Sequence, residues 1–368
     1  YAETTGGVRQ GDAPVHPGCG AMHLSADLPA GTLKAVRAEL PWKMEADERL
    51  FMNGYQTWTY SPELNRNGKL RGTDHIPGFL RKKYAFDRYG DYHFVPYGHR
   101  KGQSHGFSYC YFRKGAQFRL VASLDETPGY TILRYDSGKA LLTLERDCAG
   151  VEHPGGSFAL FDLFFAEGGE AAVFDGWFQA MGIRPRIEKK LAGYSSWYNR
   201  YQDITEDTIR EDLTGCRSLL CPGDLFQIDD GWQKQYYDWN EAGKFSLGMD
   251  SLARSIRQAG MVPGVWLSPV APNPGWDRGG WLFPVSWYAK TRTGVPDWER
   301  LDPTNPDVAA FITTSLRNMY RKGYRYFKID FNNLPLMGVR LFNPKMTRLQ
   351  AQRELFRLYR EAIGPESY

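Results

Sequence analysis

The sequence changes its pattern near residue 182, and this change constrains the fold more than any other feature of the chain. Up to about residue 170 the chain resembles a series of short β-strands, for example at 106–112, 118–123 and 130–135. Gly, Pro, Asp and Asn separate these segments about every ten residues, a rhythm typical of a β-sandwich. An amphipathic stretch over 170–181 and a linker over 182–186 follow. We therefore predict two domains, an N-terminal β-sandwich domain at 1–182 and a second domain at 183–368.

The second half alternates strands with helices. Strands are predicted at 194–198, 224–229, 262–268 and 324–331, and helices at 203–213, 251–258, 306–322 and 345–363. The alternation predicts a parallel sheet covered by helices, either doubly wound or a (β/α)8 barrel. No Gly-rich nucleotide loop follows any of these strands, which favours the barrel. Four strands are half of such a barrel, so we expect a chain that stops midway through it.

Composition excludes several classes of protein. The net charge is +4 and the Lys and Arg residues are scattered, which does not predict the basic face of a nucleic-acid-binding protein. No apolar run is long enough to predict a membrane span. The five cysteines match no zinc pattern and are interpreted as free thiols of a reducing compartment. We expect a cytoplasmic or periplasmic protein without a cofactor. The start at Tyr1 looks trimmed, so a leader would not be visible.

The distribution of histidine restricts the chemistry of the second half. All seven His residues lie between His16 and His153, so a Ser-His-Asp site or a His-ligated metal within the second half is excluded. Carboxylates, with Lys, Arg and aromatic residues beside them, remain. Carboxylates next to aromatic residues indicate glycoside hydrolysis, which uses two acids on either side of the scissile bond.

Asp330 is the strongest candidate among these carboxylates. It ends an apolar strand, and Lys328 lies two residues earlier, which places both side chains on one face of the sheet. A nearby ammonium group favours the ionised carboxylate that a nucleophile requires. The alternative is an ordinary salt bridge at the end of a strand.

Asp229 and Asp230 form a second group of candidate site residues. They belong to the motif Asp-Asp-Gly-Trp, which follows another apolar strand. A turn at Gly231 would let both carboxylates reach one ligand and accept hydrogen bonds from two sugar hydroxyls. The alternative is capping of a helix N-terminus by Asp. A Ca²⁺ loop is disfavoured because the periodic oxygen ligands and the closing Glu are missing.

Three tryptophans lie where a sugar ring could stack. They are Trp197, Trp266 and Trp58. Each of them alone is more often a core residue than a ligand platform, although Trp58 lies in a polar, Gly-containing segment where exposure is expected. Cys216 and Cys221 are interpreted as buried thiols beside a helix, and no metal site is predicted.

Six motifs occur in a fixed order along the chain. They are Asn53-Gly-Tyr-Gln-Thr-Trp58, Gly193-Tyr-Ser-Ser-Trp-Tyr-Asn199 with Asp203-Ile-Thr205, Gln227-Ile-Asp-Asp-Gly-Trp-Gln233, Gly264-Val-Trp-Leu-Ser-Pro269, Leu301-Asp-Pro303 and Phe327-Lys-Ile-Asp-Phe331. This ordered set resembles glycoside hydrolase family 36, the α-galactosidases of the melibiase and raffinose-degrading type. The resemblance implies a multidomain β plus α/β protein. Its N-terminal β-supersandwich would precede the first half of a (β/α)8 TIM-type barrel.

The resemblance also implies the role of each candidate. Asp330 falls on the nucleophile of a retaining mechanism, and Asp229 and Asp230 fall on the pair that binds galactose hydroxyls. Four residues fall on positions that form the wall of the family's sugar pocket: Lys328, Trp197, Tyr198 and Trp266. Trp58 falls on an aromatic residue that the β domain extends towards a pocket, in some members that of a neighbouring subunit. A homo-oligomer is therefore a further expectation.

One departure from the family concerns the acid/base, which is an Asp on a later strand. No Asp follows Asp330 here, and only Glu354, Glu361 and Glu366 remain, so we expect a truncated chain. The leading interpretation is an exo-acting α-galactosidase that cleaves terminal α-D-galactosides through a glycosyl-Asp330 intermediate. Alternatives are a galactosyl transferase resembling raffinose synthase, an α-N-acetylgalactosaminidase, or a non-catalytic galactoside-binding paralogue.

Overall fold

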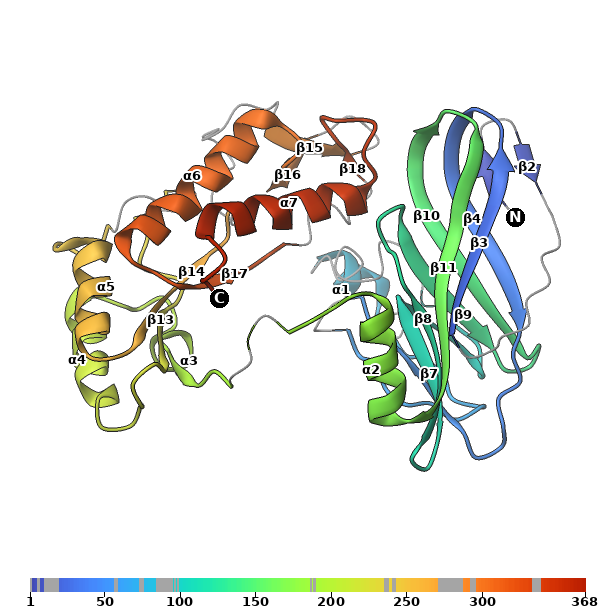
Figure 1. Cartoon of the computed structure of the whole chain (residues 1–368), viewed down its shortest axis with the longest axis horizontal. Helices are drawn as coiled ribbons and strands as arrows, with labels where there is room; N and C mark the ends of the chain where they lie inside the picture. The colour runs from blue at the N-terminus through green and yellow to red at the C-terminus, as the bar shows by residue number, and fades with distance from the viewer. Residues whose placement is uncertain are drawn as a thin grey trace. The chain divides into compact units, whose positions relative to one another are not determined.

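The computed structural model divides the chain into two compact units (Figure 1). The residues that it describes are 2–4, 7–9, 20–55, 59–72, 76–83, 95, 97, 99–185, 187, 190–234, 238–239, 243–270, 287–291, 296–332 and 339–368. The first unit is Tyr1–Arg184 with Lys345–Gln350, and the second is Pro185–Pro344 with Ala351–Tyr368.

The first unit is built from two antiparallel sheets. Among the described residues, one sheet has the order β2-β1-β4-β10-β9-β6, with strands Gly7–Arg9, Ala2–Thr4, Gly31–Pro41, Leu141–His153, Tyr130–Asp136 and Gln103–Phe107. The other has the order β3-β11-β8-β7-β5, with strands Gly20–Leu28, Gly156–Gly169, Gln117–Ser123, Tyr109–Lys114 and Arg49–Met52. Helices α1 at Gly78–Lys83 and α2 at Glu170–Ala180 accompany them.

One hydrophobic core joins the two sheets. It contains Leu33 of β4 and Leu144 of β10 from the first sheet, and Val121 of β8 and Leu163 of β11 from the second, all fully buried. Alternating strand residues from both sheets therefore face each other, which is the packing of a β-sandwich. Helix α2 covers the outer face of the second sheet through Val173 and Trp177. The antiparallel β architecture predicted for this half is confirmed.

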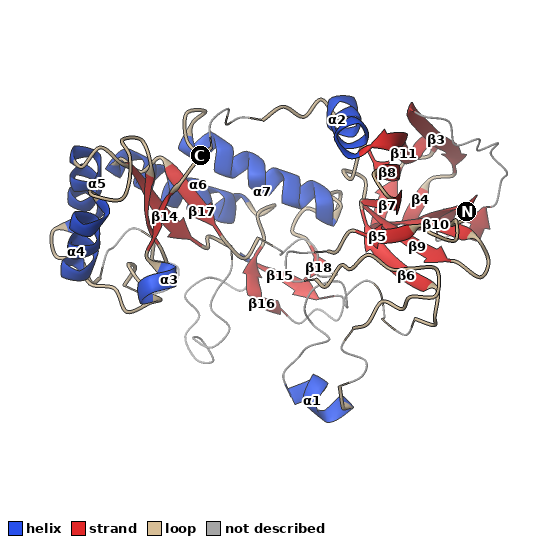
Figure 2. Cartoon of the chain, turned by 90° about the horizontal axis from the view of Figure 1, so that it is seen from below, coloured by secondary structure: helices blue, strands red, loops and turns tan. Residues whose placement is uncertain are grey.

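The second unit contains the predicted parallel sheet. Its order is β12-β13-β14-β17 within the described residues, with strands Gly193–Ser195, Leu225–Ile228, Val262–Leu267 and Tyr326–Ile329. The connecting helices are α3 at Trp197–Arg200, α4 at Glu206–Cys216, α5 at Gly248–Gln258, α6 at Pro306–Lys322 and α7 at Arg348–Ile363 (Figure 2). A small antiparallel sheet has the order β16-β15-β18, with strands Pro296–Leu301, Tyr288–Thr291 and Val339–Arg340.

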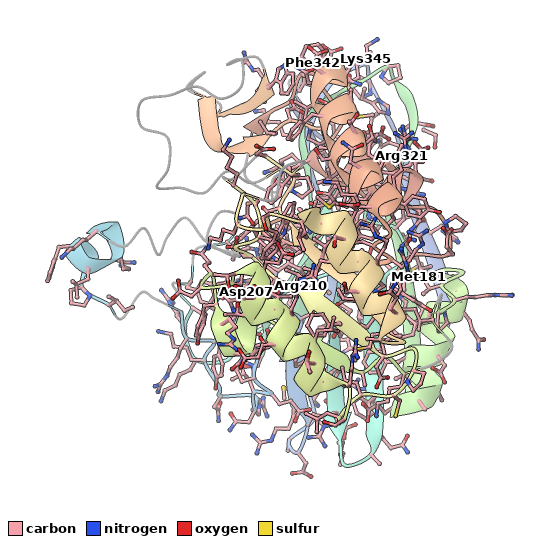
Figure 3. All side chains as sticks on the ribbon, turned by 90° about the vertical axis from the view of Figure 1, so that its left-hand side faces the viewer. Met181, Asp207, Arg210, Arg321, Phe342 and Lys345 are labelled. Carbon is pink, nitrogen blue, oxygen red and sulfur yellow. The ribbon has the colours of Figure 1, made fainter. Side chains whose placement is uncertain are left out.

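Helices α4, α5 and α6 pack on one face of the parallel sheet. Phe226 and Ile228 of β13 and Val265 of β14 are fully buried in the same core as the apolar stripes of these helices. Arg210 of α4, labelled in Figure 3, reaches α5 and donates to Ser255 Oγ at 3.0 Å. This face of the sheet is therefore apolar, and the polar side chains of the same strands are left to the opposite face.

Local sequence signals place most of these elements correctly. Helix α6 has the predicted bounds, since the Asn305 side chain caps its start and Gly323 ends it with φ +107°. Helix α4 begins at Glu206, later than the predicted start at 203, because Thr205 is the N-cap and exchanges hydrogen bonds with Thr208.

Two predicted strands have the wrong bounds. The strand predicted at 194–198 ends at Ser195, where the chain turns into α3. The segment 106–112 is two strands, separated at Ser108, whose φ is +64°. The small sheet of β15, β16 and β18 was not predicted. The buried Asp302, directly after β16, links this sheet to the segment after β18. Its carboxylate accepts hydrogen bonds from Thr304 and from Phe342 N, the latter at 2.5 Å. Burial raises the pKa of Asp302.

The cysteines are free thiols in the described structure. Cys110, Cys148 and Cys216 are buried, whereas Cys221 is exposed, so the prediction of a buried thiol is confirmed for Cys216 and wrong for Cys221. Burial raises the pKa of the Cys148 thiol to about 12. No helix in the part of the chain that the structure describes is long and apolar enough to cross a bilayer.

Candidate active site

The register of the parallel sheet brings the predicted polar residues to one face. Gln227 pairs with Gly264, and Trp266 pairs with Lys328, so the side chains at alternate positions of β13, β14 and β17 share the face opposite the helices. Asp229 extends the row of Gln227 by two residues, and Asp330 extends that of Lys328 in the same way. The carboxylates therefore follow two strands at their C-terminal ends, where parallel α/β folds place their sites.

Asp229 is the most enclosed of the three carboxylates, with 1% of its surface exposed. Its Oδ2 accepts from Lys328 Nζ at 2.8 Å, from Gln227 Nε2 at 2.7 Å and from Ser195 Oγ at 3.4 Å. Its backbone N–H donates to Ser196 Oγ at 2.8 Å. The charge is thus paired and hydrogen-bonded, as a buried carboxylate requires.

Asp230 occupies the turn that follows, and it is also buried. Gln233 Nε2 donates to its Oδ1 and Gln202 Nε2 to its Oδ2, both at 2.6 Å. The turn is made at Gly231, whose φ is +113° and where a Cβ would lie 2.7 Å from Gln202 O. A residue without a side chain is therefore required there, and the expectation of a turn at Gly231 is confirmed.

Asp330 lies just beyond β17 and is half-buried. Its Oδ2 accepts from Trp266 Nε1 at 3.2 Å, and its Oδ1 accepts from the backbone N–H of Phe331 at 2.8 Å. Phe331 has φ +54°, a conformation uncommon for a bulky residue and found at constrained sites. The carboxylate is held by neutral donors, while the ammonium of Lys328 pairs with Asp229.

The ring of Trp266 is buried behind this carboxylate. It is 2% exposed and packs edge-on against Trp239, with ring centroids 5.8 Å apart. Its backbone carbonyl accepts from Trp232 Nε1 at 2.9 Å. Trp266 is thus in direct contact with Asp330 and is fixed on both sides.

Trp197 and Tyr198 lie on the short helix α3. Tyr198 is 84% exposed, and Trp197 packs edge-on against Tyr201 at 5.2 Å. The helix is anchored by Asp212 of α4, which accepts from Tyr194 Oη at 2.6 Å and from Arg200 Nη2 at 2.8 Å. Burial acts to raise the pKa of Asp212, but the hydrogen bonds from Arg200 and Tyr194 outweigh it and leave this pKa below its usual value.

The structure therefore changes the partners expected from the sequence. Lys328 was placed beside Asp330 by its spacing, and the ion pair observed is with Asp229.

Trp58 lies outside the described residues. Neither Asp229 nor Asp230 caps a helix, since the next helix among the described residues, α5, begins at Gly248 with Leu247 as its N-cap. No group of potential metal ligands is found in the described part of the chain.

Sequence reasoning missed the residues that support the carboxylates. They are Ser195, Ser196, Gln202, Gln227 and Gln233. Gln227 lies two residues before Asp229, so period-two geometry could have placed it on the same face. Gln202 carries no comparable signal, because it reaches Asp230 from a different segment of the chain.

The chain is similar to known α-galactosidases. No family model matches the sequence. It is 26% identical over 180 residues to the α-galactosidase AgaA of Geobacillus stearothermophilus, a match that spans 45% of this chain and 24% of that protein. In structure it is similar to the α-galactosidase TtGalA of Thermus thermophilus in complex with stachyose, with a TM-score of 0.63, 22% identity, and coverage of 95% of this chain and 73% of that one.

The solved structure of AgaA has the same fold over a larger protein. The TM-score is 0.57 and the identity 16%, with 89% of this chain and 46% of AgaA covered, so the chain spans about half the length of that relative. The structural likenesses show the shared fold, and the sequence match adds a relative whose structure is described as a GH36 α-galactosidase. In fold and in sequence the chain is thus similar to α-galactosidases of glycoside hydrolase family 36.

Proposed function

We propose that the protein is a retaining exo-α-galactosidase that acts on terminal α-D-galactosides of the melibiose and raffinose type. The observation that carries the proposal is the gathering of Asp229, Asp230 and Asp330 at the ends of two strands of one sheet. Three complexes of two relatives support the sugar: TtGalA was solved with stachyose and with p-nitrophenyl α-D-galactopyranoside, and an AgaA variant was solved with raffinose.

Asp330 is the proposed nucleophile. Its carboxylate accepts two hydrogen bonds from neutral groups, Trp266 Nε1 and Phe331 N, which orient it without forming a salt bridge at its oxygens. Attack by one oxygen on the anomeric carbon would form a glycosyl-Asp330 ester and expel the aglycone. Water would then cleave the ester with net retention.

Asp229 and Asp230 are the proposed receptors for sugar hydroxyls, with Lys328 beside them. A carboxylate oxygen can accept more than one hydrogen bond, so donors from the protein and from a sugar can share it. Tyr198, which is largely exposed on α3, and Trp197 beside it are proposed as walls for the sugar ring. Trp266 is proposed to act through Asp330.

The second carboxyl group of the mechanism is proposed to be a residue other than the three glutamates after Asp330. Glu354 and Glu361 both pair with Arg357, and Glu366 accepts from Tyr320 Oη. The two ion pairs lie on α7, and the hydrogen bond of Glu366 lies just after that helix. All three carboxylates are thus engaged in ordinary surface contacts. The acid/base is therefore expected on a different strand end, as the family resemblance implies.

We further propose that β12, β13, β14 and β17 are the first half of a (β/α)8 barrel in a catalytic domain at 183–368, preceded by a β-supersandwich domain at 1–182. The backbone of Tyr368 supports this arrangement. Its N–H donates to Arg325 O at 2.8 Å, and its carbonyl accepts from Phe327 N at 2.9 Å. This is the bonding pattern of a parallel neighbour of β17, at the place of a fifth strand.

Replacement of Asp330 by Ala in the full-length protein tests the function. Hydrolysis of an aryl α-galactoside should fall by about three orders of magnitude or more, because the covalent step is lost. Added azide should restore turnover and give the β-galactosyl azide, since a small anion can attack from the side that the carboxylate vacates. Asp207→Asn, an exposed position on the first turn of α4, is the matched control (Figure 3). Activity of Asp330→Ala within about tenfold of the parent would reject the assignment.

A further inference from the structure

Asp230 is held by two amide groups that come from different parts of the chain. Gln233, three residues further along the same turn, donates to Oδ1, and Gln202, which follows α3, donates to Oδ2. Asp230 is 5% exposed, whereas Gln202 is exposed at the surface. A surface residue therefore controls one oxygen of a buried carboxylate.

The backbone of Gln202 is itself fixed in place. Lys244 Nζ donates to Gln202 O at 2.8 Å. The same carbonyl packs against Gly231 so closely that a Cβ at that glycine would lie 2.7 Å from it. Tyr201, immediately before, has φ +50°. The main chain on both sides of the hydrogen bond is thus constrained, and the amide of Gln202 is aimed at Asp230 by the loop that carries it.

The amide supplies a donor without a charge. A buried carboxylate needs hydrogen-bond donors, and a cation at Oδ2 would compete for it with an incoming ligand more strongly than a neutral N–H does. We propose that Gln202 is a positioning residue, which orients the Asp230 carboxylate for the hydroxyl groups of a sugar by donating a hydrogen bond to its Oδ2. This inference rests on the proposed function, because it assigns Asp230 to sugar binding.

Gln202→Glu tests whether sugar binding requires a hydrogen-bond donor at position 202. A protonated Glu side chain has the same shape as Gln and can donate an O–H to Asp230 Oδ2. An ionised one has no donor and places a second anion against Asp230, so that the two carboxylates share a proton and titrate as a pair. The affinity of the variant for galactose should therefore approach that of the parent protein at acid pH and fall as the pH rises towards neutrality.

Gln202→Ala removes the donor at every pH. Its affinity for galactose should be lower than that of the parent by at least about tenfold. This loss should not depend on pH, because alanine adds no titratable group. Gln258→Glu is the control: it adds the same charge at an exposed position at the end of α5. Its pH profile should follow that of the parent.

Calorimetric titration of the full-length protein and the three variants with galactose, from about pH 4.5 to 8, gives the dissociation constants across the range in which a coupled Glu–Asp pair titrates. The inference is supported if only Gln202→Glu shows the acid rescue. It is overturned if Gln202→Glu parallels Gln258→Glu, or if Gln202→Ala binds as the parent does. A parent protein that binds no galactose would instead reject the proposed function itself.

Discussion

The ion pair between Lys328 and Asp229 can be tested by substitution. Lys328→Met removes the cation and keeps most of the side-chain stem. Asp229, its partner, is 2% exposed in its side chain, whereas Lys328 is 33% exposed. The variant therefore leaves a buried carboxylate without its counter-ion, and we expect the free energy of unfolding of the second unit to fall.

The size of the effect follows from the geometry. The charged atoms are 2.8 Å apart, and two unit charges at this separation attract by about 6 kcal/mol at an effective dielectric constant of about 20. Desolvation and the ordering of the lysine offset most of this. Asp229 also keeps its hydrogen bond from Gln227. A net loss of about 2 kcal/mol remains, which is the usual range for a hydrogen bond to a charged group.

Urea unfolding followed by tryptophan fluorescence measures this loss, and two double-mutant cycles assign it. The cycle of Lys328→Met with Asp229→Asn should give a coupling free energy of about 1–2 kcal/mol, since the two side chains are in contact. The cycle with Asp330→Asn should give less than about 0.5 kcal/mol. Equal or larger coupling to Asp330, or a single variant as stable as the parent, would refute the reasoning.

Three further predictions concern the supports of the site. Gly231→Ala should lower the free energy of unfolding by about 2 kcal/mol or more, because its φ is +113° and its Cβ would meet Gln202 O; Gly115→Ala, with φ +59° and open space, should cost less in the same urea titration. Asp212→Asn should lower the urea midpoint at neutral pH. The pKa of Asp212 is lowered in the folded state, so its contribution is present above the unfolded pKa of about 3.9 and is lost as pH falls through the folded one. The difference between variant and parent should therefore shrink in acid, and a constant difference would contradict the assigned cause. Asn305→Ala removes the N-cap of α6 and should cost about 1 kcal/mol in thermal unfolding; an unchanged midpoint would show that the cap is redundant.

The elements of the fold could be predicted because their signals are local. Pro306 and Gly323 mark the two ends of α6 in the sequence itself, and both lie where they were expected. The alternation of apolar and polar residues in β13 and β17 could be recognised in the same way, because strand periodicity needs only a few consecutive residues. The identity and order of Asp229, Asp230 and Asp330 as candidate site residues came from such local patterns.

The contacts of these residues could not be predicted, because they depend on which strands lie side by side. Lys328 and Asp330 are close in sequence, yet the ammonium of Lys328 reaches Asp229, 99 residues away, across the parallel sheet. Gln202 reaches Asp230 over 28 residues, from a loop that the Gly231 turn holds in place. The sequence by itself determined that a β half precedes a β/α half, where α6 begins and ends, and which carboxylates follow the strands. Only the tertiary structure decided which donor meets which carboxylate, since the register between strands, and not spacing along the chain, sets those distances.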